Sequence, residues 1–150
     1  MQTKEIKPIT AICFSCQTNL SGLSRYVRVK ARELYQSALK NNMEITGPVY
    51  WFYHGMDGNP ETMFILEICL PVQASEFSDE QFEIMQLPVF KCLSATYCGD
   101  WMGMPDIYGE LINHALNSGY QLTGTSREVY INMDFETPEN NITEVQIGIN

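Results

Sequence analysis

The chain has 150 residues, 45% hydrophobic and 18% charged, and its 9 lysines and arginines against 18 aspartates and glutamates give a formal net charge of −9 at pH 7. This length fits one domain that buries roughly 70% of the surface its unfolded chain exposes, and the composition excludes a disordered chain and a membrane-spanning one. The negative charge opposes binding to nucleic acid phosphates and to anionic membranes, so we expect no direct contact with either.

The N-terminal segment MQTKEIKPITAI has neither the apolar stretch nor the cleavage site of a signal peptide, which favours a cytoplasmic protein. The first predicted strand covers residues 9–17 and contains a CxxC sequence, Cys13-Phe14-Ser15-Cys16. A second CxxC is absent from the sequence and His54 and His114 are isolated, so the ligand pairs of a zinc site are missing. We therefore expect no metal or other cofactor, no disulfide framework among the five cysteines, and small apolar packing roles for these thiols.

A helix is predicted next at residues 24–42, followed by strands at 49–55 and 63–72 around the turn MDGNPE. An acidic connector at 73–86 leads to a second set of elements in the same order. These are a strand at 88–98, a helix at 104–117 that Ser118-Gly119 ends, and strands at 126–133 and 142–149 around DFETPENN. The order predicts an α+β fold of two β-α-β-β units, about 5–72 and 87–150. Because one unit is too small to bury its own sheet, we expect a single domain over 1–150.

The two halves also repeat in sequence at a constant offset of 77 residues. Residues 33–72 and 110–149 align without a gap and share eleven identical pairs, where unrelated sequences give roughly two or three. The pairs are Glu33/Glu110, Leu34/Leu111, Ala38/Ala115, Leu39/Leu116, Thr46/Thr123, Gly47/Gly124, Tyr53/Tyr130, Met56/Met133, Asp57/Asp134, Ile65/Ile142 and Glu67/Glu144. Such a repeat predicts two pseudo-symmetric units packed as a duplicated antiparallel sheet, with a central ligand groove where they meet.

Alternation along the strands predicts which side chains face this groove. We expect the apolar sets to face the core: Val129, Ile131, Met133, Val145, Ile147 and Ile149, and in the first half Phe52, Leu66, Ile68, Leu70 and Val72. We expect the alternate sets to face the groove together: Trp51, Tyr53, Glu67, Glu128, Tyr130 and Glu144. Aromatic rings beside carboxylates suit a flat cation, with about 0.5–2 kcal/mol of stacking and cation–π attraction per ring. The alternative is an ordinary solvated sheet face.

The sequence also carries an ordered set of motifs. GPVYWFYHGMD and FILEICLPV occupy the first half, and in the second Gly99 and Trp101 precede the helix, Gly119 follows it, and the last two strands contain Arg127-Glu128-Val129-Tyr130 and Thr143-Glu144. Over nearly the whole chain this pattern resembles the effector-binding domain of AraC-type and MerR-type bacterial multidrug regulators, which also occurs alone in DNA gyrase inhibitor-like proteins.

The resemblance implies a groove with aromatic walls and a buried acid that receives cationic lipophilic aromatic compounds. By position, Glu128 or Glu144 is the acid, and the resemblance leaves the choice between them open. Tyr130, Trp101 and Tyr108 are the implied wall residues, although the family usually has tyrosine where this chain has Trp101. Trp101 and Tyr108 also fit a purely structural role as core or capping aromatics.

Three functions remain open from the sequence. The leading hypothesis is a stand-alone protein that binds cationic aromatic small molecules, as a drug sink or as the sensing half of a split regulator with a separate DNA-binding partner. The second is a hydrolase of electrophilic small molecules in which a groove glutamate acts as general base. The third is an inhibitory partner of another protein, such as a gyrase-interacting factor. We expect binding rather than catalysis, because the sequence offers no Ser-His-Asp or Cys-His arrangement.

Overall fold

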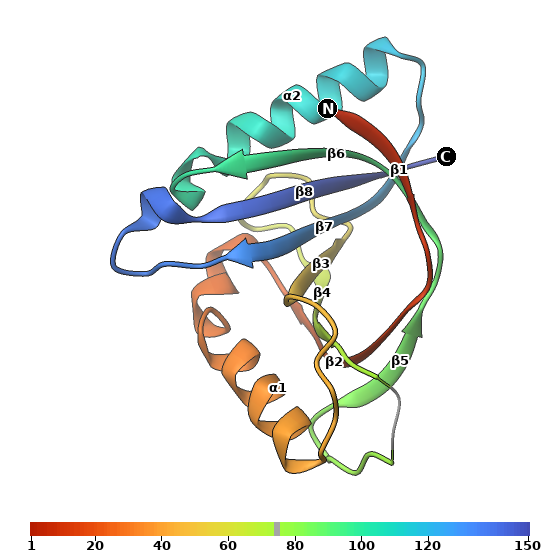
Figure 1. The fold of residues 1–150 in the computed structure, drawn as a ribbon. Helices are drawn as coiled ribbons and strands as arrows, with labels where there is room; N and C mark the ends of the chain where they lie inside the picture. Colours follow the sequence, from red (N-terminus) through yellow and green to blue (C-terminus); the bar gives the residue numbers. More distant parts are fainter. Residues whose placement is uncertain (74–75) are drawn as a thin grey trace. The chain divides into compact units, whose positions relative to one another are not determined.

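The computed structural model describes residues 1–73 and 76–150, which form two compact units (Figure 1). The N-half unit is Pro8–Pro88, and the C-half unit combines Met1–Lys7 with Val89–Asn150. Eight strands, all paired antiparallel, and two α-helices lie in the described residues, so the predicted α+β class is confirmed. No helix in this part of the chain is long and apolar enough to cross a membrane.

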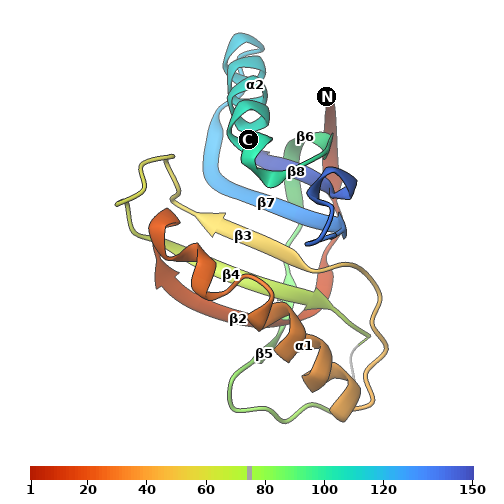
Figure 2. The same ribbon diagram turned by 90° about the vertical axis from the view of Figure 1, so that its left-hand side faces the viewer.

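In the N-half unit the strands pair in the order β5-β2-β4-β3, with β2 (Ile9–Thr18), β3 (Tyr50–His54), β4 (Phe64–Pro71) and β5 (Glu83–Leu87). The 3₁₀ helix η1 (Leu20–Arg25) and helix α1 (Val29–Lys40) connect β2 to β3, and α1 crosses one face of the sheet (Figure 2). Lys30 Nζ of α1 lies 4.5 Å from the ring centroid of Phe14. Phe14 and Trp51 both pair with Ile68, so α1 covers the face that carries these residues, because paired residues point to the same side.

In the C-half unit the strands pair in the order β1-β6-β8-β7, with β1 (Gln2–Ile6), β6 (Phe90–Cys98), β7 (Leu122–Asn132) and β8 (Ile142–Ile149). The 3₁₀ helix η2 (Trp101–Gly103) and helix α2 (Met104–Asn117) follow β6, and η3 (Pro138–Asn140) lies between β7 and β8. Helix α2 packs its Leu111 and Ala115 against one sheet face (Figure 1). The predicted core residues Val145, Ile147 and Ile149 are in this cluster, so their assignment is confirmed. The assignment is wrong for Ile131 and Met133, which are 51% and 37% exposed near the end of β7, and Val129 is buried on the opposite face, where it pairs with Glu144.

Apart from shifts of one or two residues at their ends, the predicted elements match the structure except at four places. One is the strand predicted at 126–133, since β7 begins at Leu122. The helix expected at 24–42 is divided, because Arg28 takes a left-handed conformation with φ 68° and α1 begins only after it. Strand β1 was not predicted, and β5 begins within the segment expected to be a connector at 73–86, of which residues 74 and 75 are outside the described residues. Both strands have one paired neighbour in their unit and mostly exposed side chains, so they lack the apolar alternation of a half-buried strand.

The strand registers of the two units correspond at the offset of 77. Trp51 pairs with Ile68, Phe52 with Glu67 and Tyr53 with Leu66. The pairs 77 residues later are Glu128 with Val145, Val129 with Glu144 and Tyr130 with Thr143. Equivalent positions in sequence are therefore equivalent in their sheets, while the descent of both units from one duplicated sequence stays a prediction.

Cys13 and Cys69 are joined by a disulfide bond. They are register partners on β2 and β4, with 3% and 0% of their surfaces exposed, and they pack in a core cluster with Phe52 and Leu87. The packing role predicted for Cys13 is confirmed, but the expectation that the thiols stay reduced is wrong for this pair. The bond forms because β2 and β4 pair antiparallel, which places two cysteines that are 56 residues apart in the chain directly opposite each other.

Candidate functional site

The strand register divides the predicted groove residues of the C-half unit between opposite sheet faces. Glu128 pairs with Val145 and therefore lies on the face that α2 covers, whereas Glu144 pairs with Val129 on the other face. The prediction that Glu128 and Glu144 share a face is wrong. Its physical reason is that both faces of β7 are buried, with 8% of Glu128 and 6% of Val129 exposed, so polarity does not distinguish the faces.

The same division occurs in the N-half unit. Trp51 and Tyr53 pair with Ile68 and Leu66 on the α1-covered face, with 6% and 3% of their surfaces exposed. Glu67 pairs with Phe52 on the opposite face, so the expected grouping of Glu67 with the two aromatic residues is wrong.

The predicted core set of this half is also divided between faces. Leu66, Ile68 and Leu70 point to one face of the sheet, whereas Phe52, which pairs with Glu67, points to the other. All four side chains are buried. On the side of Phe52, Glu67 Oε1 lies 2.6 Å from His54 Nε2. The groove predicted between the repeats stays a prediction.

Glu144 lies in a polar cluster that includes the ammonium group of Lys4. Lys4 Nζ donates to Glu144 Oε1 at 3.0 Å, Ser94 Oγ donates to Oε2 at 3.0 Å, and the side-chain amide of Gln146 donates to Oε2. Burial works to raise the pKa of Glu144, but these hydrogen bonds and the charge of Lys4 outweigh it and hold that pKa below its usual value. The negative charge of Glu144 is thus neutralised inside the C-half unit.

Glu128 has a different environment, built from tyrosine hydroxyls. Tyr108 Oη donates to Glu128 Oε2 at 2.6 Å, and Tyr130 Oη donates to Oε1 at 2.5 Å. Tyr108 comes from α2, while Glu128 and Tyr130 stand two residues apart on β7 and so point to the same side. Both distances are typical of hydrogen bonds from a hydroxyl to a carboxylate. The two tyrosines are neutral donors, so they orient the carboxylate.

Aromatic rings extend this arrangement outward. The Trp101 ring lies 5.5 Å from the Tyr130 ring and 5.5 Å from the Phe135 ring, both edge to face. Trp101 Nε1 donates to Thr143 Oγ1 at 3.0 Å, which fixes the indole. We call Trp101, Tyr108, Glu128, Tyr130 and Phe135 the aromatic–acid cluster.

The structure therefore brings together four of the predicted site residues, Trp101, Tyr108, Glu128 and Tyr130. Their role in ligand binding stays a prediction. Phe135 was not predicted, because it lies in the loop between β7 and β8, where strand alternation carries no information.

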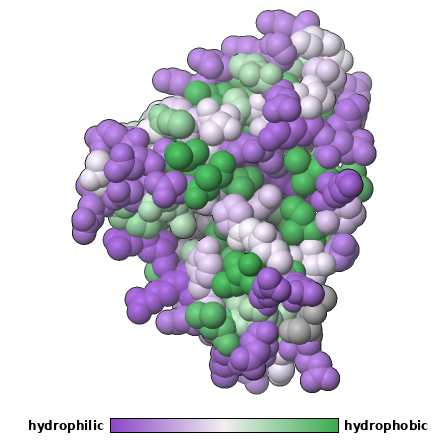
Figure 3. Space-filling view, in the orientation of Figure 1, coloured by the Kyte–Doolittle hydropathy of each residue, from purple (hydrophilic) through white to green (hydrophobic). Residues whose placement is uncertain are grey.

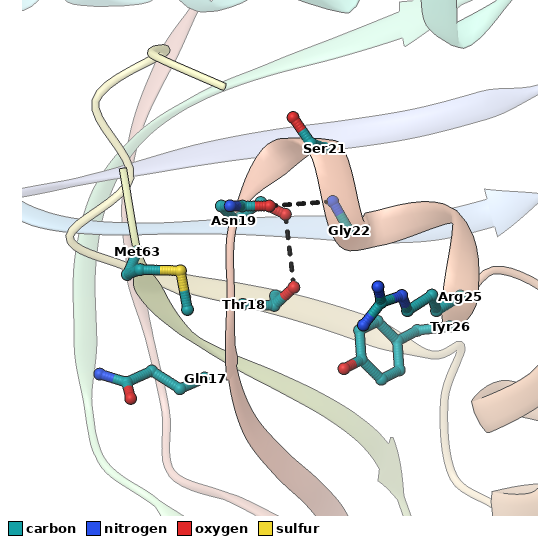
Figure 4. Close-up of a pocket in the computed structure, with 8 residues that line it drawn as sticks. All are labelled: Gln17, Thr18, Asn19, Ser21, Gly22, Arg25, Tyr26 and Met63. Carbon is teal, nitrogen blue, oxygen red and sulfur yellow. Dashed lines mark hydrogen bonds between the residues drawn. The ribbon is translucent and has the colours of Figure 1, made fainter. Parts of the chain in front are cut away.

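A separate hollow of about 340 Å³ opens in the N-half unit (Figure 4). It is lined by Gln17, Thr18, Asn19, Ser21, Gly22, Arg25, Tyr26 and Met63. Arg25 and Tyr26 form one side of it, and Met63 and Gln17 the other (Figure 4). Arg25 is the charged residue of this lining, and a guanidinium repels a cation, so the hollow does not fit the predicted ligand.

Comparison with known proteins agrees with this fold. Among solved structures, the chain is similar to the C-terminal domain of EcmrR, with a TM-score of 0.82 and 19% identity over 99% of this chain and 96% of that one. It is also similar to EcmrR in its complex with DNA, with a TM-score of 0.83 and 21% identity over 99% of this chain, and it spans 56% of that EcmrR chain. SAV2435 bound to tetraphenylphosphonium gives a TM-score of 0.64 and 11% identity over 99% of this chain and 93% of that one.

These likenesses establish the fold. Curated protein sequences give no significant match. The sequence pattern of the GyrI-like small molecule binding domain, in contrast, matches residues 1–150. The chain therefore belongs to the family of GyrI-like small molecule binding domains.

Proposed function

We propose that this small-molecule binding domain takes a lipophilic aromatic cation as its ligand, and that Glu128 is the acid that neutralises the ligand's charge. The observation that carries the proposal is the nearly buried Glu128 carboxylate, held by the hydroxyls of Tyr108 and Tyr130. A carboxylate shielded from water interacts with a cation more strongly than a surface carboxylate does. The adjoining ring of Trp101 offers stacking and cation–π attraction to an aromatic ligand.

The contacts of Glu144 make it the weaker of the two candidates. Lys4 already forms an ion pair with it at 3.0 Å, so a cationic ligand would have to compete with a resident ammonium group. Glu144 also faces away from the aromatic–acid cluster. We therefore assign to Glu144 the role of holding β1 to the sheet through Lys4.

A ligand-binding role for Trp51 and Tyr53 stays a prediction of the sequence. They occupy the sheet positions equivalent to Glu128 and Tyr130, on the helix-covered face of their own unit. Glu67 is excluded from the proposal, because it lies on the opposite face and is paired with His54.

A lipophilic cation is also the ligand of one structural relative, since SAV2435 was solved with tetraphenylphosphonium bound. The similarity to EcmrR in its DNA complex supports the sensing half of a split regulator as the context of binding, with a separate DNA-binding partner. Hydrolysis of an electrophile and inhibition of a partner protein stay predictions of the sequence.

The test compares a cation with a neutral molecule of similar shape. Calorimetric titration of the protein with tetraphenylphosphonium and with triphenylphosphine oxide should show saturable binding of the cation and at least tenfold weaker binding of the neutral molecule. In Glu128→Gln, which keeps the size of the side chain and removes its charge, this preference should fall to within about threefold. Equal affinity for both molecules in the unaltered protein would contradict the proposal.

A further inference from the structure

Apolar side chains reach the surface among hydrophilic ones (Figure 3). Three large ones lie at the end of β7 and in the loop after it. They are Ile131, Met133 and Phe135, of which 51%, 37% and 40% of the surface is exposed. Phe135 differs from the other two because it belongs to the aromatic–acid cluster, where its ring contacts Trp101.

A continuous row of contacts joins this exposed ring to the buried acid. Phe135 contacts Trp101 at 5.5 Å between ring centroids, Trp101 contacts Tyr130 at the same distance, and Tyr130 donates its hydroxyl to Glu128. Exposure falls along this row from 40% at Phe135 to 8% at Glu128. A ligand whose charge lies at Glu128 and whose rings extend toward solvent would therefore meet Trp101 and then Phe135.

The loop that carries Phe135 is held in place on both sides of the ring. Asp134 Oδ1 accepts from the backbone nitrogens of Glu136 and Thr137 at 3.0 and 2.8 Å, and its Oδ2 accepts from Asn140 Nδ2 at 3.1 Å. These bonds close the turn around Phe135 and keep it from unfolding into solvent.

Asn141, of which 1% is exposed, then ties this loop to the segment before Trp101. Its Oδ1 accepts from the Asp134 backbone nitrogen at 2.7 Å, and its backbone oxygen accepts from Gly99 at 2.9 Å. Gly99 has φ 141°, a conformation that favours glycine. The two loops that present Phe135 and Trp101 are thus joined through one buried residue, which fixes the distance between the two rings.

We propose that Phe135 forms the solvent-side wall of the ligand site and sets the size of aromatic cation that the site accepts, with Asp134 as the positioning residue of its loop. This inference rests on the proposed function. A cation with large rings reaches Phe135 and gains its contact, whereas a small cation held at Glu128 does not. Phe135 therefore determines selectivity for ligand size, and Glu128 determines selectivity for ligand charge.

The experiment titrates Phe135→Ala with a large and a small cation. We expect the dissociation constant of tetraphenylphosphonium to rise about 3- to 10-fold, the contribution of one aromatic contact, and that of tetraethylphosphonium to change less than twofold. Phe135→Tyr, which keeps the ring, should bind both like the unaltered protein. Leu116→Ala removes an apolar side chain of α2 that is 57% exposed and serves as the control, with both constants unchanged.

A second readout does not depend on any ligand. In the ligand-free protein, Phe135→Ala and Asp134→Ala should both shift the Trp101 Nε1–H resonance in a ¹H–¹⁵N spectrum. Phe135→Ala removes the ring that lies against the indole, and Asp134→Ala removes the hydrogen bonds that hold the loop carrying this ring. In Asp134→Ala the loss of affinity should again be confined to tetraphenylphosphonium.

The inference is overturned if Phe135→Ala binds tetraphenylphosphonium unchanged, or if it weakens the large and the small cation equally. Failure of the unaltered protein to bind either cation would instead refute the proposed function. If tetraphenylphosphonium binding is weakened by Glu128→Gln but not by Phe135→Ala, the proposed function is supported and only the role of Phe135 is refuted.

Discussion

Opening the Cys13–Cys69 bond should lower the free energy of unfolding by about 4 kcal/mol. The bond joins residues 56 apart in sequence, and a loop of this length removes roughly 14 cal/mol/K of entropy from the unfolded chain. Both sulfurs are in the core and stay there as thiols, so the packing is kept and the loop entropy dominates. For a chain of 150 residues this corresponds to a fall in Tm of about 13 °C.

Circular dichroism melts with and without a phosphine reductant measure the effect. The double variant Cys13→Ala/Cys69→Ala is the matched control, because its Tm should not respond to reductant while Cys16, Cys92 and Cys98 are still present. A thiol titration of the denatured, unreduced protein should find three free thiols. Five free thiols, or a Tm that reductant leaves unchanged, would refute the bond and the reasoning that follows from it.

Three further predictions concern the C-half unit. Glu144→Gln loses the ion pair to β1 and should lower the free energy of unfolding by about 1–3 kcal/mol, measured by urea denaturation; an unchanged midpoint would count against the assigned role. Hydrogen bonds from its own loop hold the pKa of Asp134 below its usual value, so the loop gains stability above the unfolded-state pKa and loses it as pH falls through the folded-state pKa. The Trp101 indole resonance should therefore stay constant from about pH 7 to 5 and shift below about pH 4, whereas a shift that begins near neutral pH would show that another group controls the loop. Gly148→Ala would place its Cβ 2.9 Å from a backbone oxygen of β7 and should cost about 1–3 kcal/mol, whereas Gly109→Ala, in α2 with nothing within 4 Å, should stabilise by about 1 kcal/mol; equal thermal midpoints for the two variants would contradict the packing.

Local signals in the sequence were sufficient for most of the elements. Helix α2 begins and ends at the predicted residues, because Met104-Pro105 is a good helix start and Ser118-Gly119 a good stop. Strands β1 and β5 were missed because each has one paired neighbour in its unit and exposes most of its side chains. Neither sequence therefore shows the alternation of apolar and polar residues that marks a half-buried strand.

The site was predictable in composition but not in arrangement. Alternation gives the two faces within one strand, but which face of β7 matches which face of β8 depends on register. Because Glu128 and Val129 are both buried, hydrophobicity could not supply that register. The pairing of Glu128 with Val145 then separates the two acids and leaves one of them beside the aromatic rings. Phe135 could not be predicted as a site residue for a different reason, since its position depends on the turn that Asp134 closes and not on the alternation of a strand.

The central claim is that Glu128, and not Glu144, receives the charge of the ligand. Its most direct test is the dissociation constant of tetraphenylphosphonium for Glu128→Gln and Glu144→Gln, measured under the same conditions. Loss of a charge partner shielded from water costs about 2–5 kcal/mol, so Glu128→Gln should bind at least thirtyfold more weakly than the unaltered protein, and Glu144→Gln should bind within twofold of it. Equal losses in both variants, or a larger loss in Glu144→Gln, would contradict the assignment.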